Sequence, residues 1–174
     1  MKLKIAQNGD FVKKYFNSGN YGRDYNYYNV EENTFYAKYE NIDTIYALRA
    51  DGDDILTLEK EGQVIKENVL ENSCKGWSYE CSFDTSLVED VSGKMKVTYY
   101  YTDFYKINSK NHKNINDVIW QQHLERSNGS YPLKIIRKLS SYRLTFTATD
   151  VERKNIKELN KHQFLQKFPI VYIY

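Results

Sequence analysis

The chain has 174 residues, of which 41% are hydrophobic and 28% are charged, a composition that excludes a disordered chain and fits one globular domain. No apolar run reaches the roughly 18–20 residues that a membrane-spanning helix needs. No apolar segment follows the first lysines, so we expect neither a transmembrane helix nor a secretion signal. The two cysteines are too few for a disulfide scaffold, and we expect free thiols.

The net charge of +2 hides an asymmetry along the chain. Residues 1–91 hold 10 basic and 17 acidic side chains, whereas residues 92–174 hold 15 and 6. The acid is concentrated in residues 31–90, with 5 basic and 15 acidic side chains. This pattern favours charged contact surfaces, unless folding brings the two halves together and cancels the field.

In the N-terminal third, alternation of Leu3 and Ile5 with lysines predicts an edge strand over residues 1–6. Residues 17–33 are rich in Gly, Asn and Asp and predict one long loop. Asp51-Gly-Asp-Asp54 predicts a hairpin turn, and Glu61-Gly62 a second turn. The strands that we expect around these turns cover residues 34–40, 42–50, 55–60 and 63–66.

The middle of the chain carries the clearest strand pattern. In residues 77–84, Trp77, Tyr79, Cys81 and Phe83 alternate with polar residues, and residues 94–102 repeat this period of two. Residues 142–148 alternate in the same way. We expect these aromatic faces to line the interior.

Two helices are expected in the C-terminal half. One is capped by Asn114 or Asn116, runs to about Arg126 and stops at Asn128-Gly129. A second is capped by Asp150 and runs over residues 151–161, with Ile156 and Leu159 inward. Further strands are expected over 133–139, 141–149 and 169–174. The predicted fold is a single β-rich domain over residues 1–174, mainly β (α+β), an antiparallel β-sandwich or barrel-like domain with about two short helices.

No known catalytic pattern is present. His112, His123 and His162 show no metal-binding spacing, and His112 lies in a polar stretch that predicts a solvated loop histidine. Asp51–Asp54 lacks the spacing of a calcium loop. Gly-x-Ser-x-Gly and Gly-Lys-Ser/Thr are both missing. We therefore predict no catalytic residue, no cofactor and no metal, and a protein that is not an enzyme.

Binding fits the sequence better than catalysis. Tyr gives large, stiff contact area at little entropic cost, and lysines or arginines interleaved with aromatic residues suit a single-stranded nucleic acid. Nucleic acid is a possible but not a favoured partner, since no known nucleic-acid-binding motif is present. The acidic stretch could instead mimic a phosphate backbone. The candidate contact residues are Tyr21, Tyr25, Tyr27, Tyr28, Lys134, Arg137 and Lys138.

The leading functional hypothesis is a non-catalytic structural protein of an assembly. The abundance of Asn, Lys, Ile, Tyr and Phe indicates an AT-rich genome. We expect a phage virion component (tail, baseplate, neck or capsid accessory) that contacts itself or neighbouring subunits, in the host cytoplasm and then in the virion. The alternative is a small intracellular inhibitor of the phage counter-defence type, which binds a host protein or a nucleic-acid-binding partner.

Overall fold

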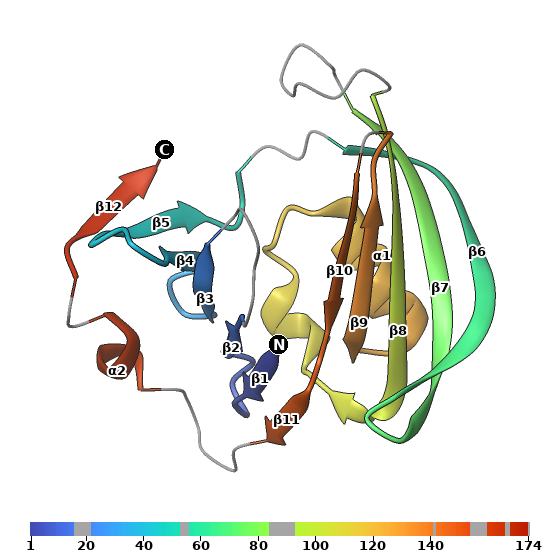
Figure 1. Ribbon diagram of the computed structural model, residues 1–174, viewed down its shortest axis with the longest axis horizontal. Helices are drawn as coiled ribbons and strands as arrows, with labels where there is room; N and C mark the ends of the chain where they lie inside the picture. Colours follow the sequence, from blue (N-terminus) through green and yellow to red (C-terminus); the bar gives the residue numbers. More distant parts are fainter. Residues whose placement is uncertain are drawn as a thin grey trace. The chain divides into compact units, whose positions relative to one another are not determined.

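The computed structural model describes residues 1–15, 22–52, 56–83, 93–140, 142–153, 160–165 and 168–173. The described chain is mainly β, with two sheets and two short helices (Figure 1), and this confirms the predicted mainly β fold class. Both sheets are open, because each strand order ends in two different edge strands, so the described residues form no closed barrel.

The chain divides into two compact units. The first consists of Met1–Gly52, Lys110–Ile115 and Thr149–Tyr174, and the second of Asp53–Ser109 and Asn116–Ala148. Each unit contains one of the two sheets. Whether they fold as one domain stays a prediction.

The first unit is built on a seven-stranded sheet with the order β11-β1-β2-β3-β4-β5-β12. Neighbouring strands from β1 to β5 are antiparallel, whereas both edge strands pair in parallel, β11 with β1 and β12 with β5. A short helix, α2, follows β11 in the chain. The bounds are β1 (Lys2–Ile5), β2 (Phe11–Lys14), β3 (Arg23–Asn29), β4 (Thr34–Tyr39), β5 (Ile45–Arg49), β11 (Asp150–Arg153), α2 (Lys161–Leu165) and β12 (Ile170–Ile173).

The second unit is built on a five-stranded antiparallel sheet with the order β10-β9-β8-β7-β6. Helix α1 contacts strands of this sheet, and a 3₁₀ turn, η2, precedes it in the chain. The bounds are β6 (Leu56–Val69), β7 (Asn72–Phe83), β8 (Lys94–Lys106), α1 (Val118–Ser127), β9 (Ser130–Lys138) and β10 (Arg143–Thr147). The turn η2 (Ser109–His112) belongs to the first unit except for Ser109.

One face of the five-stranded sheet and helix α1 enclose the core of the second unit. Tyr79, Val97 and Tyr99 alternate with polar residues along β7 and β8, and they pack with Ile119 of α1 and Ile135 of β9. Trp77, Met95 and Phe146 border this cluster. The predicted interior position of the aromatic faces is therefore confirmed for β7 and β8, as the period of two requires. For residues 142–148 it is wrong at Tyr142, which lies before β10 and is 42% exposed.

The core of the first unit has a polar centre. Asp10 is fully buried, and its carboxylate accepts hydrogen bonds from Val30 N at 2.8 Å and from the Tyr27 hydroxyl at 3.1 Å. Asn29 donates to the Tyr27 hydroxyl at 3.0 Å. Tyr27 lies opposite Tyr36 of β4, with ring centroids 6.0 Å apart. Because a buried carboxylate is costly unless hydrogen-bonded, this network fixes the turn before β2 against the β3–β4 hairpin.

The cap of helix α1 lies three residues after Asn114 and one residue after Asn116, the two caps expected from sequence. Asp117, rather than Asn114 or Asn116, is the cap, and its side chain accepts from Trp120 N at 2.8 Å. The predicted stop is confirmed, since Asn128 adopts the left-handed conformation with φ 51°.

Two predicted elements on the first unit are wrong. The expected loop over 17–33 contains β3 over Arg23–Asn29, which pairs with β2 and β4; residues 16–21 lie outside the described part. The expected helix from Asp150 begins instead as strand β11, which pairs in parallel with β1, so β1 is not an edge strand. Residues 154–159, with Ile156 and Leu159, lie outside the described part.

The predicted hairpin at Asp51–Asp54 and the predicted turn at Glu61-Gly62 are also wrong, and residues 53–55 lie outside the described part. Strands β5 and β6, which flank the first, belong to different sheets, and Glu61-Gly62 lies within β6. The hairpin turn of β6 and β7 is at Leu70 and Glu71, with φ 50° and 62°. Two consecutive positive φ values are the geometry of a type I′ turn, for which Asn and Gly, not Leu and Glu, are the usual residues.

Folding brings the acidic and the basic parts of the chain together. Strands β6 and β7 of the acidic stretch pair with each other and, through β8, with the basic part. Between described residues, five ion pairs join residues 31–90 with residues 92–174: Glu32–Lys161, Glu61–Arg126, Glu67–Lys134, Lys75–Asp103 and Glu80–Lys96. The charge asymmetry along the chain is thus largely neutralised by ion pairs within each unit.

The turn at Glu71 yields a stability prediction. Glu71→Gly removes the steric cost of a left-handed conformation, about 1–2 kcal/mol, and should raise the free energy of unfolding by about 1 kcal/mol in urea denaturation. Ser73→Gly, in the adjacent strand, is the control and should lower it by about 0.5–1 kcal/mol. Equal destabilisation by both variants would contradict the turn geometry.

Candidate functional site

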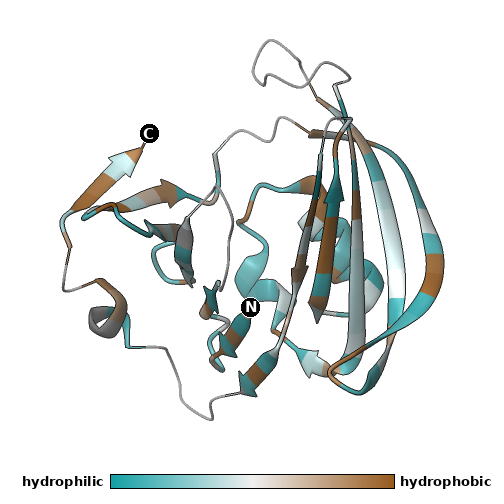
Figure 2. Cartoon of the chain, in the orientation of Figure 1, coloured by the Kyte–Doolittle hydropathy of each residue, from teal (hydrophilic) through white to brown (hydrophobic). Residues whose placement is uncertain are grey.

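Large apolar side chains are exposed together at one edge of the seven-stranded sheet. Val171, Tyr172 and Ile173 of β12 are 48%, 52% and 47% exposed, and Leu48 of the neighbouring strand β5 is 39% exposed. Ile42, just before β5, is exposed to the same degree. Figure 2 shows hydrophobic residues along both strands. We call Ile42, Leu48 and residues 171–173 the apolar edge.

The pairing of β12 with β5 explains this exposure. In the parallel register Ile173 lies opposite Leu48, and Tyr172 lies opposite the buried Ala47. Successive side chains of a strand point to opposite faces, so Ile173 and Leu48 share the face away from the core. The core face of β12 begins at Ile170, which packs on the buried cluster of this unit.

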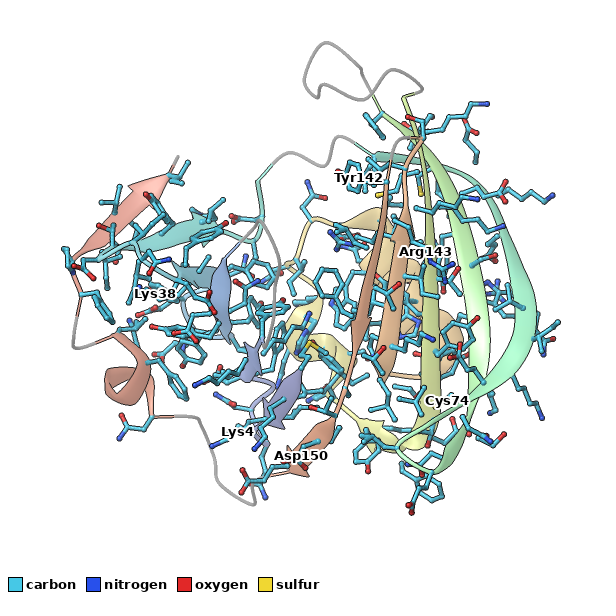
Figure 3. All side chains as sticks on the ribbon, viewed as in Figure 1. Lys4, Lys38, Cys74, Tyr142, Arg143 and Asp150 are labelled. Carbon is cyan, nitrogen blue, oxygen red and sulfur yellow. The ribbon has the colours of Figure 1, made fainter. Side chains whose placement is uncertain are left out.

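A buried lysine holds the chain just before β12. Lys38 of β4, labelled in Figure 3, is 5% exposed. Its ammonium group donates to the carbonyl oxygens of Tyr39 and Ile42. Its ammonium nitrogen lies 4.4 Å from the ring centroid of Phe168. Ile45 N donates to Pro169 O at 2.9 Å. These contacts hold the chain before β12 in place, so β12 pairs with β5 as part of the folded first unit.

The other edge strands carry charges that β12 lacks. At the far edge of the same sheet, where Figure 3 labels Asp150 and Lys4, Asp150 of β11 pairs with Lys2 at 4.0 Å and Glu152 of β11 pairs with Lys4 at 3.6 Å. Strand β6 carries several Lys and Glu residues and two register shifts. Charges and bulges are the usual protection of an edge strand against pairing with another chain. Residues 170–173 have neither.

The tyrosines expected as contact residues are not grouped on one exposed surface. Tyr27 and Tyr28 are fully buried, because β3 lies in the interior of the sheet, and they belong to the core. Tyr28 donates to the Asn33 side chain at 2.8 Å. Tyr25 is half-buried and donates to Phe164 O of α2. Tyr21 lies outside the described residues.

The basic residues expected as contacts all lie on β9. Lys134 and Lys138 lie on one face of the sheet, and Arg137 lies on the other, the face of Ile135. Lys134 is mostly covered and pairs with Glu67. Arg137 and Lys138 are exposed, and Lys138 lies opposite Lys96 on one side and Arg143 on the other. Their role in contacts stays a prediction.

Two histidines are buried rather than solvated. His112 is fully buried, its Nε2 donates to Gly9 O at 3.1 Å, and its ring stacks on Phe11 at 5.9 Å. His123 of α1 is also fully buried, and its Nε2 donates to Ser130 O at 2.8 Å. Burial lowers the pKa of each imidazole to about 4. The expectation of a solvated His112 is therefore wrong.

The thiols show no sign of activation. Cys74 and Cys81 are buried thiols that form no disulfide bond. Burial raises the pKa of Cys74, which disfavours the reactive thiolate. Across the described residues, no group of three or more His, Cys, Asp or Glu side chains could hold a metal ion. No helix of the described chain is long and apolar enough to span a membrane.

Comparison with known proteins found no matching family model, no matching curated protein and no matching solved structure.

The two buried histidines predict acid sensitivity. Their pKa values of about 4 lie below the value of about 6.5 in an unfolded chain, so the unfolded state binds more protons between these limits and stability falls as the pH is lowered. From pH 7 to pH 5 the free energy of unfolding should drop by about 2 kcal/mol per histidine, measured by urea denaturation. Between pH 9 and pH 7 these groups predict no change. A total drop below about 1 kcal/mol would contradict their burial as neutral groups.

Proposed function

We propose that this chain is a non-catalytic assembly protein that acts through protein–protein contacts, and that the apolar edge is its contact site. The observation that carries the proposal is the uncharged, exposed strand β12 at the end of a sheet. Exposed apolar side chains in contact with water are costly, and covering them by association is favourable.

The proposed partner at this edge is a second copy of the chain. Two β12 strands related by a two-fold axis would pair antiparallel and join two seven-stranded sheets into one. Such pairing brings identical surfaces together, and the lack of charge in residues 170–173 means that no like charges of this strand meet. Val171 and Ile173 would then pack against their counterparts.

The proposed setting is a phage virion, in which such a dimer would be a structural accessory. The composition of the chain supports this setting, through its AT-rich coding bias and its many tyrosines. The edge supports the more general statement, which is association through strand pairing.

Lysines placed on the edge should abolish association. Natural edge strands use lysine against pairing, and in V171K/I173K each β12 would bring two cations to the two-fold interface. Sedimentation equilibrium should show that the unmodified chain approaches twice the chain mass with rising concentration, whereas the variant stays at the chain mass.

The control is I65K/F104K, which replaces two exposed apolar residues of the five-stranded sheet. It should associate like the unmodified chain. A chain that remains monomeric at all concentrations would refute the proposed self-association. An equal loss of association in the control would place the contact outside β12.

A further inference from the structure

One row of the five-stranded sheet is occupied by charged side chains on every strand. The register places Lys60 of β6 opposite Glu80, Glu80 opposite Lys96, Lys96 opposite Lys138, and Lys138 opposite Arg143 of β10. Tyr79, Val97 and the other core residues alternate with this row, so it lies on the face away from α1. At the usual strand spacing it extends about 19 Å. We call these five residues the cationic row.

The cationic row is accessible and short of acid. Lys60, Lys138 and Arg143 are exposed, and the Lys96 side chain is 44% exposed. Glu80 accepts from Lys96 at 2.8 Å, and this bond lowers the pKa of the carboxyl, with Lys60 and Lys94 contributing. In the described part of the chain, no carboxylate pairs with Lys138 or Arg143.

This arrangement lowers stability. Like charges directly opposite each other on adjacent strands repel, and Lys96, Lys138 and Arg143 are three such neighbours in succession. Elsewhere in this unit, cations on the sheet meet acids, as in the pairs of Lys75 with Asp103 and Lys134 with Glu67. Glu80 compensates the charge of Lys96, whereas Lys138 and Arg143 are left without a carboxylate among the described residues, and such a concentration of positive charge attracts an anionic ligand.

The next row on this face is mixed. It holds Ser78 of β7, Thr98 of β8, Ile136 of β9 and Thr145 of β10; Ser78 and Thr98 are buried, and Thr145 is exposed. One step further, Tyr100 lies close over Gly76, where an added Cβ would come within 2.9 Å of its ring. Lys134 lies 5.7 Å from the centroid of the same ring. Of the three hydroxyl residues in the mixed row, Thr145, two residues along β10 from Arg143, is the one exposed beside the cations, and hydroxyl groups and cations are groups that contact phosphate and sugar.

We propose that the cationic row binds the phosphate backbone of a nucleic acid, without sequence preference. Of the three consecutive tyrosines on β8, Tyr99 and Tyr101 are buried and Tyr100 is already packed, so this face has few rings on which bases could stack. Contacts to phosphates, which carry no base information, remain. This site is separate from the apolar edge and does not depend on the proposed self-association.

The test is fluorescence anisotropy with a labelled 20-base-pair duplex, in 50 to 200 mM salt. We expect K138Q/R143Q to weaken binding about tenfold and to reduce the slope of log K against log salt by up to about 1.8, or 0.9 per phosphate contact. Thermal unfolding should show equal or higher stability for this variant, because the substitutions remove repulsion. Loss of binding with retained stability separates a binding role from a structural one.

The matched control is K14Q/K113Q, which removes two exposed lysines of the other unit and causes the same change in net charge. It should bind within about twofold of the unmodified chain. Absence of saturable binding at 50 mM salt, or equal weakening by both variants, would overturn the proposal. Binding of poly-glutamate as tight as that of the duplex would overturn it too, in favour of an acidic protein partner.

Discussion

The register of the five-stranded sheet determines what both of its faces present. With Tyr99 opposite Trp77 and Ile135, the aromatic side chains meet under α1, and the same register places Lys96 opposite Glu80 and Lys138 on the other face. A slip of one residue in any strand would bring charges into the core and rings into water. The cost of that exchange far exceeds the repulsion within the cationic row, so the fold can tolerate the row.

The two candidate surfaces depend on packing in different ways. The cationic row follows from the strand pattern of a single sheet. The apolar edge depends instead on how the chain returns to β5 after α2, and on the buried Lys38 beneath Phe168. Loss of the edge contacts would therefore leave the five-stranded sheet intact, and changes in the row would leave β12 in place.

Sequence patterns predicted the elements whose information is local. The strands around Tyr79 and Tyr99 and the stop of α1 at Asn128 were predictable from the sequence. Alternating side chains and a left-handed cap both depend on residues that are close together in the chain. Strand β11 was missed because its pairing with β1 joins residues almost 150 positions apart. The prediction of a hairpin at Asp51–Asp54 was wrong because turn-forming residues do not show whether the flanking strands pair with each other. Likewise the exposure of β12 depends on strand order, which the run of Ile, Val and Tyr cannot specify alone.

Disulfide trapping measures the register directly. Residues opposite each other on adjacent strands have Cβ atoms about 4.5–5.5 Å apart, within reach of a disulfide bond. Under mild oxidation, K96C/K138C should cross-link within one chain, whereas K96C/R137C, whose side chains point to opposite faces, should stay reduced. Cross-linking of the second pair in place of the first would show a register shifted by one residue, and it would contradict the assignment of both faces.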